Sequence, residues 1–255
     1  MNPSAVDVSL SVVSHGQMTM VKLLLDDIKR HCQTLVVEVI LTINTQDEES
    51  PGTDAYAFPV IVLRNSAPLG FGANHNKAFS HANGKYFCVV NPDIRLTMDP
   101  LGPLVVALAE PRVGIAAPAV YGLDGVQEDS ARRYPTPITL LRRLATGRHA
   151  AAQKVGIENY YPPWVGGMFM LFPRHVFTQV KGFDERYFLY YEDVDLCGRL
   201  KLAGWHAVVS PVSSVVHNAQ RSSHKSLRFF RWHVASLLRY LTSATFMRLW
   251  IRGYL

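Results

Sequence analysis

Short runs of apolar and β-branched residues alternate with segments of helical spacing through the first half of the chain. Buried strands are expected at these runs, which are residues 8–14, 36–43, 60–63, 86–90 and 113–117. Apolar residues spaced three and four apart predict helices between them, at residues 20–28, 70–82 and 101–109. The alternation predicts an α/β fold with a Rossmann-like, mostly parallel, doubly wound sheet.

The second half of the chain has a less regular pattern. Residues 121–164 contain several prolines, so we expect loops there with one short helix at residues 138–145. Later apolar runs predict strands and one short helix, at residues 165–172, 207–209 and 215–216 for the strands and 173–180 for the helix. Residues 226–255 predict a helical extension at the C-terminus, formed by one basic amphipathic helix.

The composition fits a folded domain. The 255 residues are 48% hydrophobic and 18% charged, which can form a large core and argues against disorder. Cys32, Cys88 and Cys197 have neither disulfide-framework nor zinc-motif spacing, so we expect reduced thiols in the cytoplasm. The start lacks a signal-peptide pattern, and no apolar run reaches the ~18–20 residues of a membrane span.

The net charge of +6 favours anionic partners. No nucleic-acid-binding motif is present, so nucleic acid is not an expected partner. In the C-terminal extension, arginines and aromatic residues accompany an apolar face, which suits an anionic membrane surface. The alternative is a helix packed on the domain with its arginines in solvent. The apolar face comprises Leu227, Phe230, Val234, Leu237, Leu238 and Leu241. The middle segment adds Arg132, Arg133, Arg142, Arg143, Arg148 and Lys154.

Five carboxylates lie among aromatic residues within residues 182–199, around the start of a predicted helix. The helix dipole favours acidic residues in a first turn, and Asp195 has the i,i+4 spacing to pair with Arg199. Neither effect explains why Asp193 lies in an aromatic neighbourhood. Such surroundings can desolvate a carboxylate and raise its pKa toward the range that suits a general base.

Polar residues follow several predicted strands, at the carboxyl edge where doubly wound sheets bind ligands. His15 and Asn44 follow the first two strands, and Asn91-Pro92-Asp93 follows residues 86–90. Asp93 could hold a divalent cation that bridges two phosphates, or its motif is an ordinary turn. His217 ends a later strand, where it is either a structural histidine or a ligand of Mn²⁺ or Zn²⁺.

Two glycine motifs mark places where the backbone can approach a ligand. Gly70-Phe71-Gly72 opens a predicted helix that contains Asn76 and Lys77, as in anion sites at helix N-termini. It is not a complete dinucleotide or phosphate-loop fingerprint. Gly166-Gly167 precedes a predicted strand, which favours either a ligand contact or close packing.

The ordered set of motifs resembles bacterial family 2 glycosyltransferases with a GT-A fold, especially their rhamnosyltransferase-like branch. The likeness covers roughly residues 8–225, and the order of the motifs carries it more than any one of them. The matching segments are residues 12–16, 70–72 with Asn76, 91–93, 164–168, 182–185, 192–196, and His217 with Ser222-Ser223. The resemblance implies an inverting sugar transfer in the synthesis of O-antigen, a part of lipopolysaccharide, or of another cell-surface glycan.

The resemblance also implies roles for single residues. Asp93 would hold Mg²⁺ or Mn²⁺, with His217 as a second metal ligand or a diphosphate contact, and Asp193 would be the catalytic base. The nucleotide diphosphate donor would contact His15, Asn44, Gly72, Asn76, Lys77, Asn91 and Asp93. The acceptor would contact Gly166, Gly167, Asp184 and Glu192. For Glu192, a helix cap is the alternative.

The same resemblance implies domain boundaries and substrates. Residues 1–225 would form the GT-A domain, with a nucleotide-sugar half at about 1–120 and an acceptor half at about 121–225. The expected donor is dTDP-L-rhamnose. The expected acceptor is a polyprenyl-diphosphate-linked saccharide at the inner face of the cytoplasmic membrane. The alternatives are a UDP-hexose or GDP-sugar donor, or a non-catalytic module that binds nucleotide sugars.

Two positions depart from the family pattern. Members usually have Asp-Asn after the second strand, where this chain has Ile43-Asn44, so the identity of the nucleotide stays open. Many GT-A enzymes have aspartate at the position of Asn91, and one carboxylate should bind a cation more weakly than two. Asn-Pro-Asp is common in the rhamnosyltransferase-like branch, so this departure also favours that branch.

Overall fold

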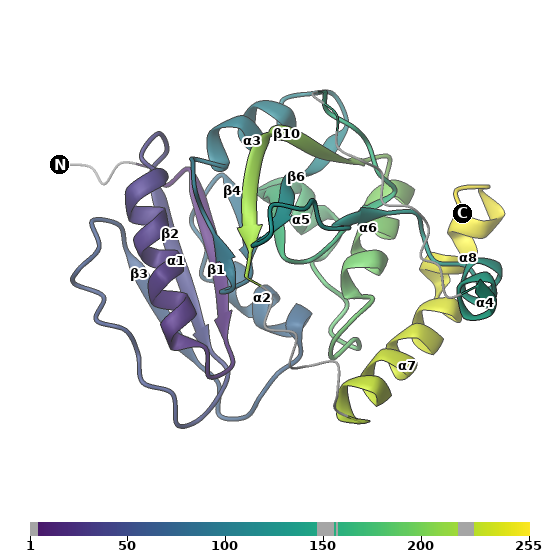
Figure 1. Cartoon of the computed structure of the whole chain (residues 1–255), viewed down its shortest axis with the longest axis horizontal. Coiled ribbons are helices and arrows are strands. Elements are labelled where there is room, and N and C mark those ends of the chain that lie inside the picture. The colour runs from purple at the N-terminus through teal and green to yellow at the C-terminus, as the bar shows by residue number, and fades with distance from the viewer. Residues whose placement is uncertain (1–4, 147–155, 157, 219–226) are drawn as a thin grey trace.

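The computed structural model describes residues 5–146, 156, 158–218 and 227–255, in which helices cover both faces of a large central sheet (Figure 1). Arg148 and Lys154 of the basic middle segment lie outside the described residues, as do Ser222, Ser223 and Ser226.

The first half alternates strands and helices, as predicted. Its elements are β1 (Val8–Ser14), α1 (Met18–His31), β2 (Val37–Ile43), β3 (Val60–Arg64), α2 (Phe71–Phe79), β4 (Tyr86–Val90), β5 (Ile94–Arg95) and α3 (Leu101–Leu108). The first four of the five strands pair in parallel, with β1 between β2 and β4. Their carboxyl ends therefore meet at one edge of the sheet.

The second half completes the sheet. Its elements are β6 (Val113–Gly122), β7 (Ala131–Arg132), α4 (Pro137–Thr146), β8 (Trp164–Val165), β9 (Phe169–Pro173), α5 (Arg174–Gln179), α6 (Glu192–Leu202) and β10 (His206–His217). The eight strands have the order β3-β2-β1-β4-β9-β6-β10-β5, while β7 and β8 form a separate ribbon. Only β9 and β5 run antiparallel to their neighbours in the large sheet, so the predicted mostly parallel α/β fold is confirmed.

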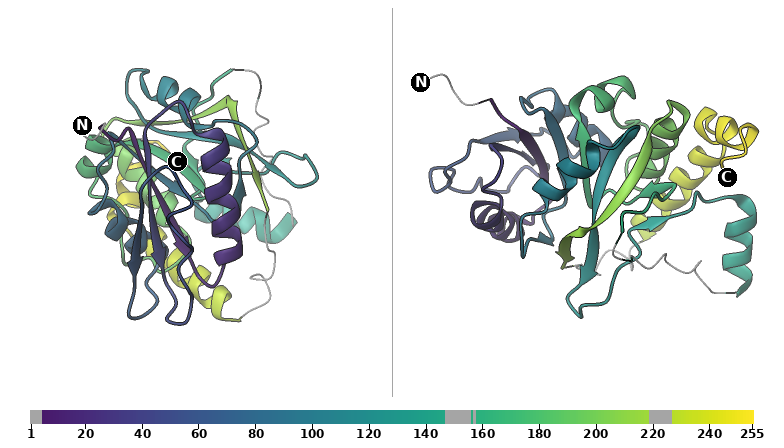
Figure 2. Two further views of the ribbon diagram at one scale, coloured as in Figure 1. Left: turned by 90° about the vertical axis from the view of Figure 1, so that its left-hand side faces the viewer. Right: turned by 90° about the horizontal axis from the view of Figure 1, so that it is seen from above.

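Two apolar cores, one on each face of the sheet, hold the layers together. Side chains alternate along β4, so that Cys88 and Val90 join the core under α1 and α3. Phe87 and Val89 join the core that contains residues of α2, α5 and α6. Figure 2 shows the strands between these two helical layers. Strands buried on both faces are the reason for the continuous apolar runs in the sequence.

The structure corrects two strand predictions. Residues 165–172 are not one strand, because residues 166–168 separate β8, in the two-stranded ribbon, from β9, in the large sheet. The strands predicted at 207–209 and 215–216 are the two ends of β10, whose pairing with β6 shifts register between Ser210 and Ser214. This irregularity interrupts the apolar pattern in the middle of the strand.

The C-terminal extension is two helices instead of the predicted single one. α7 (Leu227–Leu241) and α8 (Ala244–Ile251) are separated at Ser243, whose Oγ accepts the Phe246 N–H at 3.1 Å and caps α8. Both helices lie at the C-terminal side of the domain, where α8 contacts α6 (Figure 1). None of the helices within the described ranges is both long and apolar enough to cross a membrane.

Candidate active site

The predicted polar residues gather at the carboxyl edge of the sheet. His15 follows β1, Asn44 follows β2, Asp93 follows β4, and His217 ends β10. Because β9 is antiparallel to β4, its amino end lies at the same edge, and Gly166-Gly167 comes just before it. The topology thus brings together residues that are more than a hundred positions apart in the sequence.

Asp93 and His217 are neighbours because β5 pairs with β10, which places Ile94 opposite His217. Nε2 of His217 lies 3.2 Å from Oδ2 of Asp93, and Nδ1 lies 2.7 Å from Oε2 of Glu128. The hydrogen bond to Asp93, aided by the one to Glu128, outweighs burial and raises the pKa of His217 to about 9. In this arrangement the ring is an imidazolium at neutral pH and donates one N–H to each carboxylate.

Asp93 and His217 also fit a divalent cation. Oδ1 of Asp93 is buried without a hydrogen-bond partner among the described residues, a costly arrangement that a cation would relieve. The described residues hold no group of three or more histidine, cysteine or acidic side chains that could bind a metal. The other ligands would therefore be diphosphate oxygens and water, which Mg²⁺ commonly keeps in phosphate-binding sites. The predicted metal role of Asp93 and His217 stays a prediction.

Asp193 lies in the first turn of α6 and is partly exposed. Its Oδ1 accepts the Val194 N–H at 2.8 Å, and its Oδ2 accepts the Gly167 N–H at 3.1 Å. Burial raises the pKa of the Asp193 carboxyl even though these hydrogen bonds favour the carboxylate. The side chain is thus fixed in place, and its raised pKa suits a general base. The catalytic role of Asp193 stays a prediction.

Glu192 is buried beside Asp193. The side chain is 5% exposed, and within the described ranges its Oε2 has no hydrogen-bond partner. Burial, followed by the charge of Asp193, raises the pKa of Glu192 well above its usual range. Tyr191 is the N-cap of α6 and no side chain caps the helix, so the cap interpretation of Glu192 is wrong. Its contact with an acceptor stays a prediction.

Two consecutive tyrosines hold a strained turn directly before these acids. Tyr190 and Tyr191 have φ values of 72° and 67°, in the left-handed region that residues with a side chain rarely adopt. The turn is packed against the C-terminal helices, where the Tyr191 ring stacks on Tyr240 with a centroid distance of 5.7 Å. Packing from α7 thus supports the backbone that presents Glu192 and Asp193.

Asp195 has the structural role that its spacing predicts. Its Oδ2 accepts a hydrogen bond from Arg199 Nε at 2.7 Å, within α6. Arg199 also donates to the backbone carbonyls of Val180 and Gly182. The pair ties α6 to the turn after α5, and the predicted i,i+4 ion pair is confirmed.

Asn44 anchors the loop that precedes α2. It is fully buried, and its Oδ1 accepts the Leu69 N–H at 2.9 Å and Asn65 Nδ2 at 2.7 Å. The exposed His15 ring lies 3.1 Å from Asn44 Nδ2. Asn44 therefore holds the loop at the carboxyl edge of the sheet from a buried position, while His15 faces solvent at the same edge. Donor contacts by these two residues stay predictions.

The residues of α2 predicted to bind donor all have structural contacts. Asn76 donates to the carbonyl of Phe183 and accepts its N–H, both at 2.9 Å. Lys77 donates to Asn65 Oδ1 at 2.8 Å. A Cβ on Gly72 would lie 2.6 Å from Cβ of Phe183, so glycine here allows α2 to pack on the acidic stretch. A donor-binding role for them, as for Asn91, stays a prediction.

Three of the predicted acceptor residues lie in two places, Gly166 and Gly167 in the loop before β9 and Asp184 on a turn between α5 and α6. Gly166 donates its N–H to the Ser130 carbonyl at 2.7 Å, and a Cβ on Gly167 would lie 3.0 Å from the Phe71 ring, so both glycines are closely packed. Asp184 forms an ion pair with Arg186 at 2.6 Å on an exposed turn. Acceptor contacts by these residues stay predictions.

Sequence reasoning missed Glu128 and gave Arg132 no place in the site. Glu128 bonds His217, and Arg132 lies near enough to Asp193 for its charge to oppose the rise of the Asp193 pKa. Both lie in the segment between β6 and β8, which has no motif. Glu128 could have been sought on one ground, that a metal-binding histidine usually has a carboxylate or carbonyl partner on its other nitrogen.

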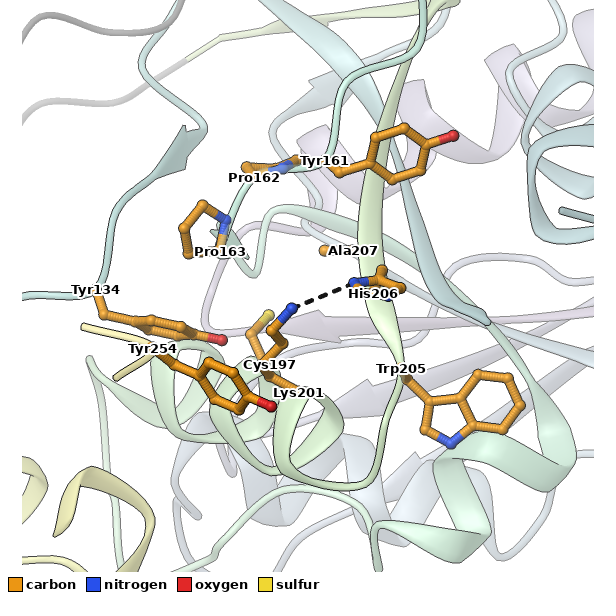
Figure 3. A pocket seen from close by; sticks show the side chains of 10 residues that line it. All are labelled: Tyr134, Tyr161, Pro162, Pro163, Cys197, Lys201, Trp205, His206, Ala207 and Tyr254. Atoms are coloured by element: carbon orange, nitrogen blue, oxygen red, sulfur yellow. Dashed lines mark hydrogen bonds between the residues drawn. The ribbon is translucent and has the colours of Figure 1, made fainter. Parts of the chain in front are cut away.

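A separate cavity of about 250 Å³ lies at the amino end of β10 (Figure 3). Lys201 Nζ lies 3.4 Å from Nδ1 of His206 in its wall. None of the predicted site residues lines it. Its walls consist of Tyr134, Tyr161, Pro162, Pro163, Cys197, Lys201, Trp205, His206, Ala207 and Tyr254.

Comparison with known proteins identifies the family. Residues 8–235 match the family model described as glycosyltransferase like family 2. The chain belongs to glycosyltransferase family 2. This glycosyltransferase is 28% identical over 248 residues to rhamnosyltransferase WbbL of Escherichia coli (strain K12), with 92% of each chain covered. It is 31% identical over 209 residues to N-acetylglucosaminyl-diphospho-decaprenol L-rhamnosyltransferase of Mycobacterium tuberculosis (strain H37Rv), covering 73% of this chain and 68% of that one.

The fold of this glycosyltransferase is also found in solved structures of GT-A glycosyltransferases. It matches GalNAc-T7, a structure with UDP, GalNAc and Mn²⁺, with a TM-score of 0.70 at 16% identity. The match covers 94% of this chain and 48% of that one. The neighbour is a GT-A glycosyltransferase, so the predicted GT-A fold is confirmed. The predicted enzyme class is confirmed by the family model and the two rhamnosyltransferases.

Proposed function

We propose that this glycosyltransferase transfers L-rhamnose from dTDP-L-rhamnose, with inversion, to a hydroxyl of a polyprenyl-diphosphate-linked saccharide. The observation that carries the proposal is the setting of Asp193. This carboxylate has a raised pKa and is held by the Gly167 N–H at 3.1 Å. The adjacent Met168 carbonyl accepts the Asn91 N–H at 2.9 Å. One short segment therefore links the proposed base to the proposed cation motif.

The choice of donor and acceptor rests on the relatives. Both curated relatives are rhamnosyltransferases, and the mycobacterial one is named for a decaprenol-diphosphate-linked acceptor. The Asn91-Pro92-Asp93 motif adds support, because it is typical of the rhamnosyltransferase-like branch. A polyprenyl-diphosphate acceptor also matches the net charge of +6, since it carries negative charge.

The chemical step uses Asp193 as general base. Its carboxylate takes the proton of the acceptor hydroxyl while that oxygen attacks the anomeric carbon of the donor sugar. The new bond forms on the face opposite the diphosphate, and the bond from the anomeric carbon to the diphosphate oxygen breaks. The nucleoside diphosphate departs with that electron pair, and the configuration at the anomeric carbon inverts.

Asp93 and His217 would hold Mg²⁺ or Mn²⁺, which when bound neutralises charge on the departing diphosphate. The donor half, at about residues 1–120, would place the nucleotide against His15, Asn44, Gly72, Asn76, Lys77 and Asn91. The acceptor half, at about residues 121–225, would place the hydroxyl near Asp193 with contacts from Gly166, Gly167, Asp184 and Glu192.

The C-terminal helices would dock on the anionic inner face of the cytoplasmic membrane. One side of α7 presents apolar side chains to solvent, namely Leu227, Phe230, Val234 and Leu238, which are 81%, 66%, 36% and 59% exposed. The exposed arginines Arg228, Arg231 and Arg239 lie on the same helix. Exposed apolar and basic side chains on one helix favour an interface with anionic lipid. Tyr240 is buried, so it belongs to the domain side of α7.

Vesicle flotation tests the docking. We expect the protein to float with vesicles of phosphatidylglycerol and phosphatidylcholine, and Phe230→Glu to weaken this binding. Val106→Glu is the matched control, because Val106 is 72% exposed but lies on α3, on the other face of the sheet. Equal flotation of wild type and Phe230→Glu would contradict docking through α7.

A transfer assay tests the reaction itself. The protein is incubated with a polyprenyl-diphosphate-linked N-acetylglucosamine and with dTDP-L-rhamnose, a UDP-hexose or a GDP-sugar, and the lipid product is measured. The proposal expects product with dTDP-L-rhamnose in excess over the other donors. Product from another donor alone would overturn the choice of sugar. Donor binding without transfer or hydrolysis would indicate a non-catalytic module.

A further inference from the structure

Glu128 is the second carboxylate on His217. We propose that Glu128 is a positioning residue that orients the His217 ring so that its Nε2 is directed to a divalent cation. This inference rests on the cation site of the proposed function. It assigns a task to a residue that lies in the segment between β6 and β7, more than eighty positions from His217.

The position of Glu128 is fixed by its backbone. Its N–H donates to the Val120 carbonyl at 2.8 Å, and its own carbonyl accepts the Ser130 N–H at 2.9 Å. Its Oε2 lies 2.7 Å from Nδ1 of His217, and the two side chains are 28% and 16% exposed. A carboxylate fixed in this way can hold the ring in one orientation.

The two carboxylates lie on opposite nitrogens of the ring. Asp93 faces Nε2 at 3.2 Å, and its Oδ1, which has no hydrogen-bond partner in the described part of the chain, marks that side as the place for a cation. Glu128 faces Nδ1. A cation on the Asp93 side would replace the proton that Nε2 carries in the cation-free ring. An acceptor on Nδ1 keeps the other proton there and fixes the ring orientation.

Asp129, the next residue, shows that the contact with His217 is specific to Glu128 and does not come from any carboxylate in this segment. Asp129 directs its Oδ2 to Arg132 at 2.7 Å instead of to His217. Of two consecutive carboxylates, only Glu128 bonds the histidine among the described residues. The contact therefore depends on the side-chain geometry of Glu128 and not on the local density of negative charge.

Electron paramagnetic resonance of Mn²⁺ in the presence of dTDP tests the inference. Wild type is compared with Glu128→Met, which keeps the bulk of the side chain, with Glu128→Ala, and with Glu128→Gln, which keeps an acceptor oxygen. Glu110→Ala is the matched control, since Glu110 accepts a hydrogen bond from Asn159 at 2.8 Å and precedes the other end of β6. Melting temperatures establish which variants are folded.

Loss of the acceptor should weaken Mn²⁺ binding roughly 10–100-fold, the usual effect of removing a partner of a metal-binding histidine. The histidine nitrogen modulation in pulsed spectra should fade in Glu128→Met and Glu128→Ala, and return in Glu128→Gln. Unchanged Mn²⁺ affinity and nitrogen modulation in a folded Glu128→Met or Glu128→Ala variant would overturn the role of Glu128 but leave the proposed cation site standing. A wild type that binds no Mn²⁺, or binds it without histidine nitrogen, would overturn the cation site as well.

Discussion

The backbone N–H of Gly167 donates to Oδ2 of Asp193 at 3.1 Å, which ties the proposed base to the loop before β9. The next carbonyl in that loop, from Met168, accepts the Asn91 N–H at 2.9 Å. Residues 166–168 therefore connect α6 with the turn that carries Asp93. A displacement of this loop should change the proposed base and the proposed cation motif together.

Gly167→Ala tests that coupling. The added Cβ would lie 3.0 Å from the Phe71 ring and 3.8 Å from Cβ of Asp193, so the loop or the ring must shift. We expect kcat to fall roughly ten- to a hundredfold, because small misplacements of a catalytic group are costly. Steady-state kinetics beside a melting curve measure this, with the variant remaining folded.

The control for that variant is Gly52→Ala, where a new Cβ meets no atom of the described chain within 4 Å. Its kcat should equal that of wild type. If Gly167→Ala also retained full activity while folded, the loop would not position Asp193.

Asp93→Ala should weaken cation-dependent donor binding. The substitution removes the carboxylate proposed to hold the cation, and a loss of at least roughly tenfold in donor affinity is expected with Mn²⁺ present. Isothermal titration with dTDP-L-rhamnose, with and without EDTA, measures it. Asp124→Ala, on an exposed turn, is the control. Equal affinities for wild type and Asp93→Ala in both conditions would remove Asp93 from the cation site.

Glu192→Gln should stabilise the protein at neutral pH. Burial, followed by the Asp193 charge, raises the pKa of folded Glu192 well above the ordinary value of 4.5. Below that ordinary value both states are protonated and the group has no effect. As the pH rises beyond it, the unfolded chain ionises first, so wild-type stability falls. The melting temperature of the variant should exceed that of wild type by roughly 2–4 °C at pH 7, which corresponds to about 1 kcal/mol in a chain of this size.

Melting curves of the same two proteins at lower pH check the sign of the effect of Glu192 on stability. The difference in melting temperature between Glu192→Gln and wild type should shrink toward zero as the pH falls below about 4.5. A variant that is less stable than wild type at pH 7 would mean that Glu192 is ionised and paired in the fold.

Much of the fold could be predicted because its causes are local or periodic. The apolar run of β4 and the polar residue after each parallel strand are readable in the sequence, and so is the carboxyl edge they define. The Asp195–Arg199 pair was predictable because i,i+4 spacing places both side chains on one side of a helix.

Other features depend on tertiary contacts and could not be predicted. Glu128 reaches His217 only because β6 and β10 are adjacent in the sheet. The left-handed backbone of Tyr190 and Tyr191 is held by packing from α7, against the preference of both residues. The break at Ser243 depends on a serine cap, whose Oγ accepts the Phe246 N–H, and the apolar face of residues 227–241 gives no sign of it.

The central claim is that Asp193 is the base, and Asp193→Asn tests it most directly. Asparagine keeps an oxygen to accept the Gly167 N–H but cannot take the acceptor proton, so the site should keep its shape. We predict that kcat for transfer falls about 10²–10⁴-fold or more, while affinity for dTDP-L-rhamnose stays within roughly twofold of wild type. Turnover by Asp193→Asn at the wild-type rate would contradict the account.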